Sequence, residues 1–415
     1  MKKMIVALLV LIGVFGLTAC GNSDDSGKTK ITYYQFSAPA DGKALQKMIS
    51  EFEKQNPKIK VDVQTIAYDD YFTKLQTQIA GGDAPDAFEL NYETFVQYAE
   101  KGVLADLNGF IKADKTFDPK QLNQEAYNAF NYKGKQYGMV ESFSNVVTIY
   151  NKDMFDKAGL KYPTADWTWE DELNAAKKLT NKDKRIWGTS QPVTMNEFFK
   201  VAAQNGGSVF NKDMTAVTMN SKQNLEALQH LTDEVTKYKV SPSPSDMSGQ
   251  LPEDLFMNGQ IGMLHTGIWL FDKFQAAPFK WDIAVEAGNT SKATHFFSNG
   301  IGVSKDSKHK EAAYKLAAFM SADKEAAKTR IESNWELPAT ENKEVLKPYL
   351  EMTPPDNRQV VFDSLQYMVL PPVVADWNKI SDYTNAQFEK VLNKEQSAEE
   401  ALDNCQKEIT KIMNF

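Results

Sequence analysis

The sequence predicts an α/β fold in two lobes, because of its length, its composition and its hydrophobic patterning. The chain has 415 residues, whereas one ordinary domain holds roughly 100 to 200. A hydrophobic content of 42% and a charged content of 25% are typical of globular proteins. Short apolar or alternating stretches, which are typical of strands, alternate along the chain with segments of helical periodicity. This alternation predicts a mostly parallel sheet with helices on both faces.

The N-terminal segment predicts secretion and lipid anchoring. Two lysines precede an uncharged apolar run over residues 4–18. This is the outline of a signal peptide, and the run is shorter than the roughly 20 residues of a spanning helix. It ends in LTACG at residues 17–21, which resembles the lipobox of bacterial lipoproteins, where the cysteine is lipidated and the chain is cut before it. We therefore expect a signal peptide over residues 1–19, a lipid on Cys20, and a flexible tether over the polar residues 20–29.

After the tether, the chain opens with a strand–helix–strand–helix–strand series. The expected strands and helices are, in order, residues 31–36, 41–55, 59–66, 71–80 and 87–90. Ligand sites of such sheets lie beyond the carboxyl ends of the strands. Ser37 follows the first strand, and Asn91 and Glu93 follow the third. These polar side chains are therefore candidate ligand-binding residues.

The later part of the chain is richer in helical patterns. Thr168, with Asp171 three residues later, predicts a capping box that opens a helix ending near Leu179. Residues 221–238 carry leucines at helical spacing. The segment SPSPS at residues 241–245 is typical of a surface loop.

Charge and motif content exclude several classes of function. The formal net charge of −8 disfavours nucleic acid and phosphorylated ligands. The four histidines are scattered and form no zinc motif, and no nucleophile elbow or phosphate loop occurs. We therefore expect no metal, no cofactor and no catalytic residues. Cys405 lies on an apolar stripe of helical spacing, so we expect it in a core.

Several motifs occur in a fixed order along the chain. They are AGGDAPD at 80–86, YAEKGVLADL at 98–107, YNKDMFDKAGL at 150–160, WTWE at 167–170, NGG at 205–207, FMNGQIGM at 256–263, GIW at 267–269, GIGVS at 300–304 and LPA at 337–339. Together they resemble family 1 extracellular solute-binding proteins, which include the maltose-binding protein. The resemblance covers nearly the whole mature chain.

The resemblance implies a periplasmic-binding-protein-like fold, in which a hinge joins two α/β lobes around a central ligand cleft. We place the crossings between lobes near Val140, Thr294 and Val345. Lobe one then comprises residues 30–139 and 295–343, and lobe two comprises residues 140–294 and 344–415.

The resemblance also implies a function. The chain would capture a sugar or oligosaccharide at the outer face of a cell membrane, as in Gram-positive members. It would deliver this sugar to an ABC importer made of permease subunits and an ATPase. A polyamine or peptide binder of the same fold and a secreted carbohydrate-active enzyme remain alternatives.

The same comparison implies further binding residues. Trp269, in the GIW motif, corresponds to the tryptophan that stacks on sugar, and Trp335 and Trp377 are further candidate rings. Ser144 and Asn145 lie near a predicted crossing, and Asn299 precedes the GIGVS motif. The alternative for Trp269 is core packing, Trp335 could instead cap the first lobe, and the alternative for each polar residue is turn or cap formation.

Overall fold

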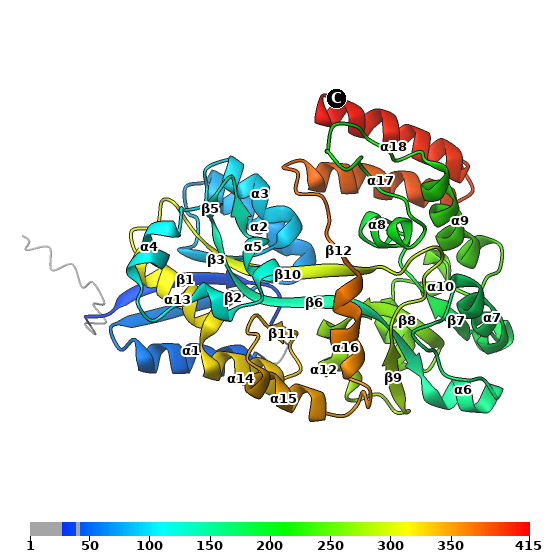
Figure 1. Ribbon diagram of the computed structural model, residues 1–415, viewed down its shortest axis with the longest axis horizontal. Helices are drawn as coiled ribbons and strands as arrows, with labels where there is room; N and C mark the ends of the chain where they lie inside the picture. The colour runs from blue at the N-terminus through cyan, green and yellow to red at the C-terminus, as the bar shows by residue number, and fades with distance from the viewer. Residues whose placement is uncertain (1–26, 39–41) are drawn as a thin grey trace, which may run out of the picture.

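The structure is a computed structural model that describes residues 27–38 and 42–415. Figure 1 shows two groups of helices and strands on either side of two long central strands, β6 (Gly138–Asn151) and β10 (Thr294–Val303). We call the groups the β1 group and the β8 group, after one strand in each. The predicted signal peptide, residues 1–19, and Cys20 lie outside the described residues.

The β1 group contains the predicted alternating series. Its elements are β1 (Thr29–Gln35), α1 (Lys43–Gln55), β2 (Ile59–Thr65), α2 (Tyr68–Ala80), β3 (Ala87–Asn91), α3 (Tyr92–Glu100), α4 (Asn108–Ala113), α5 (Gln124–Asn128), α13 (Lys310–Ala322), α14 (Lys324–Glu332), β11 (Leu337–Pro338) and α15 (Lys343–Glu351). Strand β1 is parallel to both β2 and β3. The strands and helices predicted for residues 31–90 are confirmed, with ends shifted by a few residues.

The β8 group contains most of the later chain. Its elements are α6 (Lys152–Ala158), α7 (Trp169–Leu179), β7 (Trp187–Ser190), α8 (Met195–Gln204), α9 (Lys222–Thr236), α10 (Pro244–Met247), α11 (Pro252–Met257), β8 (Ile261–Gly267), α12 (Phe271–Phe274), β9 (Trp281–Ala284), α17 (Trp377–Leu392) and α18 (Ala398–Met413). The capping box of Thr168 and Asp171 is confirmed at the start of α7. The surface loop expected at residues 241–245 is wrong in part, because Ser243 caps α10 and Pro244 is its first residue, a position that proline favours.

The central strands join both groups into one sheet of order β2-β1-β3-β10-β6-β8-β7. Strand β6 pairs with β10 through residues 138–145 and with β8 and β9 through residues 146–151. The sheet is mixed rather than mostly parallel, because β10 runs antiparallel to both β3 and β6. The lobe boundaries near Val140, Thr294 and Val345 stay predictions.

The segment that connects α15 to α17 passes in front of the central strands in Figure 1. It contains α16 (Gln359–Ser364) and the short strand β12 (Met368–Val369), which pairs with the start of β10. Cys405 of α18 is fully buried among apolar residues, as its helical stripe predicts. Within the described part of the chain, no helix combines the length and the apolar character needed to span a membrane.

Candidate functional site

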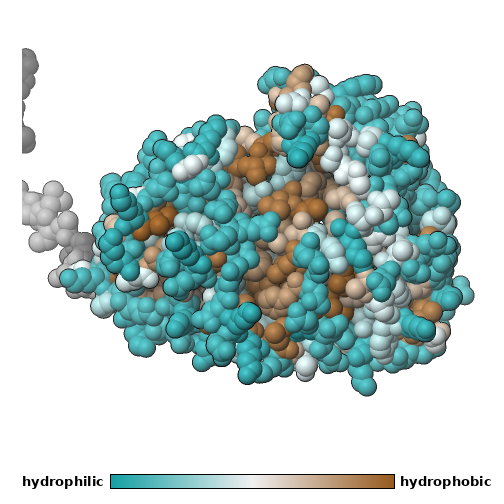
Figure 2. Space-filling model, in the orientation of Figure 1, coloured by the Kyte–Doolittle hydropathy of each residue, from teal (hydrophilic) through white to brown (hydrophobic). Residues whose placement is uncertain are grey.

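The strand ends of both groups meet in the middle of the molecule. Asn91, the last residue of β3, is paired with Asn299 of β10, and Asn299 is paired with Ser142 of β6. Gly267, the last residue of β8, is paired with Val146, four residues further along β6. Figure 2 shows hydrophobic residues gathered on this face between the two groups, where the surface is hollowed. The carboxyl ends of strands, where α/β proteins bind ligands, thus converge from both sides.

A buried carboxylate organises the polar part of this junction. Glu336 accepts hydrogen bonds from Ser142 Oγ (2.5 Å) and Ser144 Oγ (3.1 Å) of β6. It also accepts one from Asn299 Nδ2 of β10 (3.3 Å). Ser142 and Ser144 lie on the same face of β6 because side chains alternate along a strand. The structure therefore brings together the predicted residues Ser144 and Asn299, around a carboxylate that the sequence analysis did not single out.

Backbone geometry brings Glu336 to this place. Glu336 directly precedes β11, which pairs with β6 through Leu337 and Pro338. The backbone of Glu336 has a φ of 50°, in the left-handed region that costs a non-glycine residue about 1 kcal/mol or more. Such strain is kept where surrounding contacts determine the conformation, and it is concentrated at functional sites.

An aromatic pair lies beside the polar cluster. Trp269, in the short helix η3 (Ile268–Leu270), is half-buried, and its ring meets that of Phe297 edge to face at 5.2 Å. Phe297 is two residues before Asn299, so both side chains project from the same face of β10. Gly267 permits this arrangement, since a Cβ there would lie 1.7 Å from Cζ3 of Trp269. Aromatic rings next to anchored polar groups fit a ligand with both apolar and hydroxyl surface.

A second aromatic group stands at the end of β1. The backbone N–H groups of Phe36 and Ser37 donate to Glu89 Oε2 at 2.9 and 3.1 Å, which fixes the chain just beyond the strand. The Phe36 ring meets Tyr68 at 5.2 Å, and Tyr68, which is 50% exposed, accepts a hydrogen bond from Asn91 Nδ2 at 3.0 Å. Asn91 and Ser37 therefore belong to one small assembly with two exposed or half-exposed rings.

Two buried carboxyl groups on the β1 side have raised pKa values. Burial, reinforced by the neighbouring carboxylate of Glu141, raises the pKa of Glu89 to about 8. Burial raises the pKa of Glu93 to about 7. Glu93 Oε2 has no hydrogen-bond partner among the residues that the structure describes. Such an oxygen is costly to bury unless another donor meets it.

The other predicted site residues lie elsewhere. Asn145 points away from the Glu336 cluster, and its Nδ2 donates to the Val361 carbonyl oxygen of α16 at 2.8 Å. Trp335 and Trp377 are each 2% exposed and belong to hydrophobic cores. The Trp335 ring is covered by the guanidinium of Arg330, whose central carbon lies 4.0 Å from the ring centroid. Rings this deeply buried offer little surface to a ligand.

Four residues of the junction were missed by the sequence analysis: Phe36, Tyr68, Phe297 and Glu336. Phe36 and Phe297 have a sequence signal, because each is next to or near a predicted polar site residue. Glu336 follows a candidate tryptophan, but nothing local shows that its side chain reaches two strands. Tyr68 begins α2 and has the pattern of an ordinary helix start.

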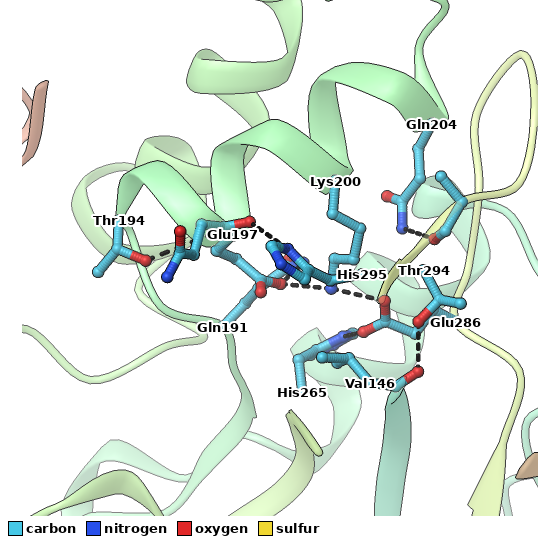
Figure 3. Close-up of polar contacts among 12 residues, drawn as sticks. Val146, Gln191, Thr194, Glu197, Lys200, Gln204, His265, Glu286, Thr294 and His295 are labelled. Atoms are coloured by element: carbon cyan, nitrogen blue, oxygen red, sulfur yellow. Dashed lines mark hydrogen bonds and ion pairs between the residues drawn. The ribbon is translucent and has the colours of Figure 1, made fainter. Parts of the chain in front are cut away.

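A buried ion cluster supports the β8 group. Lys200 Nζ of α8 lies 2.5 Å from carboxylate oxygens of both Glu197 and Glu286 (Figure 3). The ring nitrogens of His265 lie 2.6 Å from Glu172 and 2.8 Å from Glu286. Burial alone would lower the pKa of His265, but the two carboxylates raise it well above its usual value. Glu197, His265 and Glu286 have the spacing of metal ligands, but the ammonium of Lys200 already supplies the positive charge there.

Comparison with known proteins gives the family. Residues 37–327 match the family model described as bacterial extracellular solute-binding protein. A solved structure, the ABC substrate-binding protein Lmo0181 from Listeria monocytogenes in complex with cycloalternan, is 76% identical. It superposes with a TM-score of 0.92, covering 94% of this chain and 100% of the other.

More distant relatives also match over most of the chain. The arabinooligosaccharide-binding protein of Bacillus subtilis (strain 168) is 27% identical over 351 residues, which cover 79% of this chain and 78% of the relative. The cyclic alpha-maltosyl-1,6-maltose binding protein from Arthrobacter globiformis is 22% identical with a TM-score of 0.75, covering 93% of this chain and 99% of the other, and so shares the fold. The chain therefore belongs to the family of bacterial extracellular solute-binding proteins.

Proposed function

We propose that this protein captures an oligosaccharide outside the cell and delivers it to an ABC importer. The observation that carries this proposal is the 76% identity, over 94% of the chain, to a protein solved in complex with cycloalternan. Cycloalternan is therefore the first ligand to test.

The junction between the two groups supplies suitable chemistry for a sugar. The half-buried ring of Trp269 can stack on the C–H face of a sugar ring, as aromatic side chains stack on apolar surface. Asn91, Glu93 and the cluster around Glu336 offer acceptors and donors for hydroxyl groups. Ser37 joins them at the end of β1. In this proposal Trp335 and Trp377 have a packing role, and Asn145 fixes α16 to the central strands.

Binding in this proposal is coupled to closure of two lobes. Strands β6 and β10 connect the groups, and small changes in their backbone angles would move one group toward the other. A sugar held from both sides stabilises the closed arrangement, because its contacts are complete only there. The importer would then recognise the closed, loaded form.

Retention at the cell surface is part of the same proposal. A lipid on Cys20 would hold the protein at the outer face of the membrane, and residues 20–29 would give it reach. No covalent step on the sugar is needed for this role, and none is proposed.

Isothermal titration calorimetry with the purified protein tests the ligand. We expect cycloalternan to bind and to be recovered chemically unchanged after prolonged incubation. Maltooligosaccharides and arabinooligosaccharides test the breadth of the site, and a polyamine and a short peptide test the other ligand classes. Cleavage of the sugar would replace this proposal with an enzyme, and binding of only the polyamine or the peptide would replace the ligand class.

A further inference from the structure

The Glu336 carboxylate connects three segments that are far apart in the sequence. Its hydrogen-bond donors lie on β6 (Ser142 and Ser144) and on β10 (Asn299), whereas Glu336 itself precedes β11. The donors on β6 are 194 and 192 residues away from Glu336 along the chain. One buried side chain therefore holds both central strands to the β1 group.

These hydrogen bonds lie close to the residues at which strand β6 changes its pairing partner. Strand β6 leaves β10 after residue 145 and pairs with β8 from residue 146. The pairing of β10 with β6 has an irregularity between Asn299 and Gly300. The three donors to Glu336 therefore lie between this irregularity and the change of partner, next to positions where the strand pairing is interrupted.

The charge of Glu336 is met by neutral donors. Among the described residues, the ion pairs formed by arginine and lysine do not include Glu336, and Arg330 instead pairs with Glu141. Glu336 is 6% exposed, so its carboxylate relies on the two hydroxyls and the amide for stabilisation. Hydrogen bonds to a charged group are about twice as strong as neutral ones, which makes their geometry well defined.

We propose that Glu336 is a positioning residue for ligand capture. Its carboxylate orients Ser142, Ser144 and Asn299 and thereby fixes the relative placement of β6 and β10 beside Trp269 and Phe297. The effect on ligand affinity rests on the proposed function, whereas the effect on the two strands does not. Glu336 acts through its neighbours, so its loss should change binding and local strand order more than overall stability.

The test compares Glu336→Gln with a matched control. Glutamine keeps the size of the side chain but replaces one acceptor oxygen with a donor that faces Asn299 Nδ2 or a serine hydroxyl. Ser298→Ala is the control, because Ser298 on β10 is buried like Ser142 and Ser144. Its Oγ donates to the backbone oxygen of Ser142 rather than to Glu336. Ser144→Ala is a milder variant that removes one donor and keeps the carboxylate.

Two measurements decide the outcome. We expect Glu336→Gln to raise the Kd for cycloalternan about tenfold or more and to speed amide hydrogen exchange at residues 142–145 and 298–300 in the unliganded protein. Ser144→Ala should change both in the same direction but less. Ser298→Ala removes one hydrogen bond between β10 and β6 but leaves Glu336 with all its donors, so it should leave the Kd unchanged and change hydrogen exchange less than Glu336→Gln does. A Glu336→Gln protein with unchanged exchange at both strands would overturn the proposal. Equal effects of Glu336→Gln and Ser298→Ala would also overturn it, because the role would then be general packing.

The design separates this inference from the proposed function. If the wild-type protein binds no sugar, the proposed function fails. Hydrogen exchange of β6 and β10 still tests whether Glu336 positions the two strands. If Glu336→Gln does not fold, Ser144→Ala supplies the same comparison with Ser298→Ala. If Ser144→Ala then binds the sugar with unaltered affinity and shows unaltered hydrogen exchange, the positioning role of Glu336 is refuted and the proposed function is not.

Discussion

Trp269 is the residue whose replacement tests the binding surface most directly. Its indole is half-buried and contacts Phe297, so part of the ring surface is packed and part is exposed. We expect Trp269→Ala to weaken oligosaccharide binding by about 2 to 4 kcal/mol, measured by calorimetry. The control is Trp377→Phe, in a core, which should lower the melting temperature without changing affinity. A folded Trp269→Ala protein of unaltered affinity would show that the ring only packs.

Glu93 should make stability depend on pH. Burial raises its pKa from 4.5 to about 7 in the folded protein. The favourable contribution of the protonated group is therefore fully present below pH 4.5 and is lost as the pH rises to about 7, because the unfolded chain ionises first. We expect Glu93→Gln to be more stable than the wild type by about 3 kcal/mol at most at pH 8 and equally stable at pH 4. Urea unfolding at both pH values measures this difference.

The control for Glu93 is Glu125→Gln, at an exposed carboxyl group near the start of α5. The effect of Glu125→Gln on stability should differ less between the two pH values than that of Glu93→Gln, because the Glu125 side chain is exposed. A Glu93→Gln protein whose stability advantage does not grow with pH would mean that Glu93 is ionised and paired in the folded protein.

At the scale of elements, helix α8 depends on its buried lysine. Lys200 joins α8 to the segment after β9 through Glu286, and Glu286 also pairs with His265 of β8 (Figure 3). We expect Lys200→Met to lower the free energy of unfolding by about 3 to 5 kcal/mol, because Glu197 would remain buried without its cation and Glu286 would keep only His265 as a partner. Chemical denaturation at pH 7 measures the loss.

The control for this element is Lys222→Met. Lys222 pairs with Glu226 at 3.6 Å on the exposed face of α9, and such pairs contribute about 1 kcal/mol or less. Equal losses in the two variants would mean that the buried cluster adds no more stability than a surface pair.

At the scale of the whole molecule, membrane attachment should depend on one cysteine. The sequence has two cysteines, and Cys405 is fully buried in α18. We expect Cys20→Ala to abolish incorporation of labelled palmitate and to release the protein from the membrane fraction of a producing bacterium. Cys405→Ala should keep both properties. Equal labelling of wild type and Cys20→Ala would contradict a lipid anchor at this position.

Particular residues show where sequence reasoning succeeded and where it stopped. Patterns that act over a few residues were reliable: the alternation that predicted β1 to β3, the capping box of Thr168 and the buried stripe of Cys405. Local patterns did not predict that Trp335 is buried, or which side chain Ser144 contacts. Trp335 is covered by Arg330, and Ser144 meets a carboxylate 192 residues away.

Residue patterns along the chain were enough to predict the alternating elements and the family and to show no metal or nucleotide motif, because helix and strand periods and family motifs are local properties. Tertiary structure alone decided that β6 and β10 form one mixed sheet with both groups. It also decided that Glu336 gathers Ser142, Ser144 and Asn299 at their junction. The physical reason is that burial and hydrogen bonding depend on which distant segments pack together, and strand order is set by the packing of whole faces rather than by the residues of one strand.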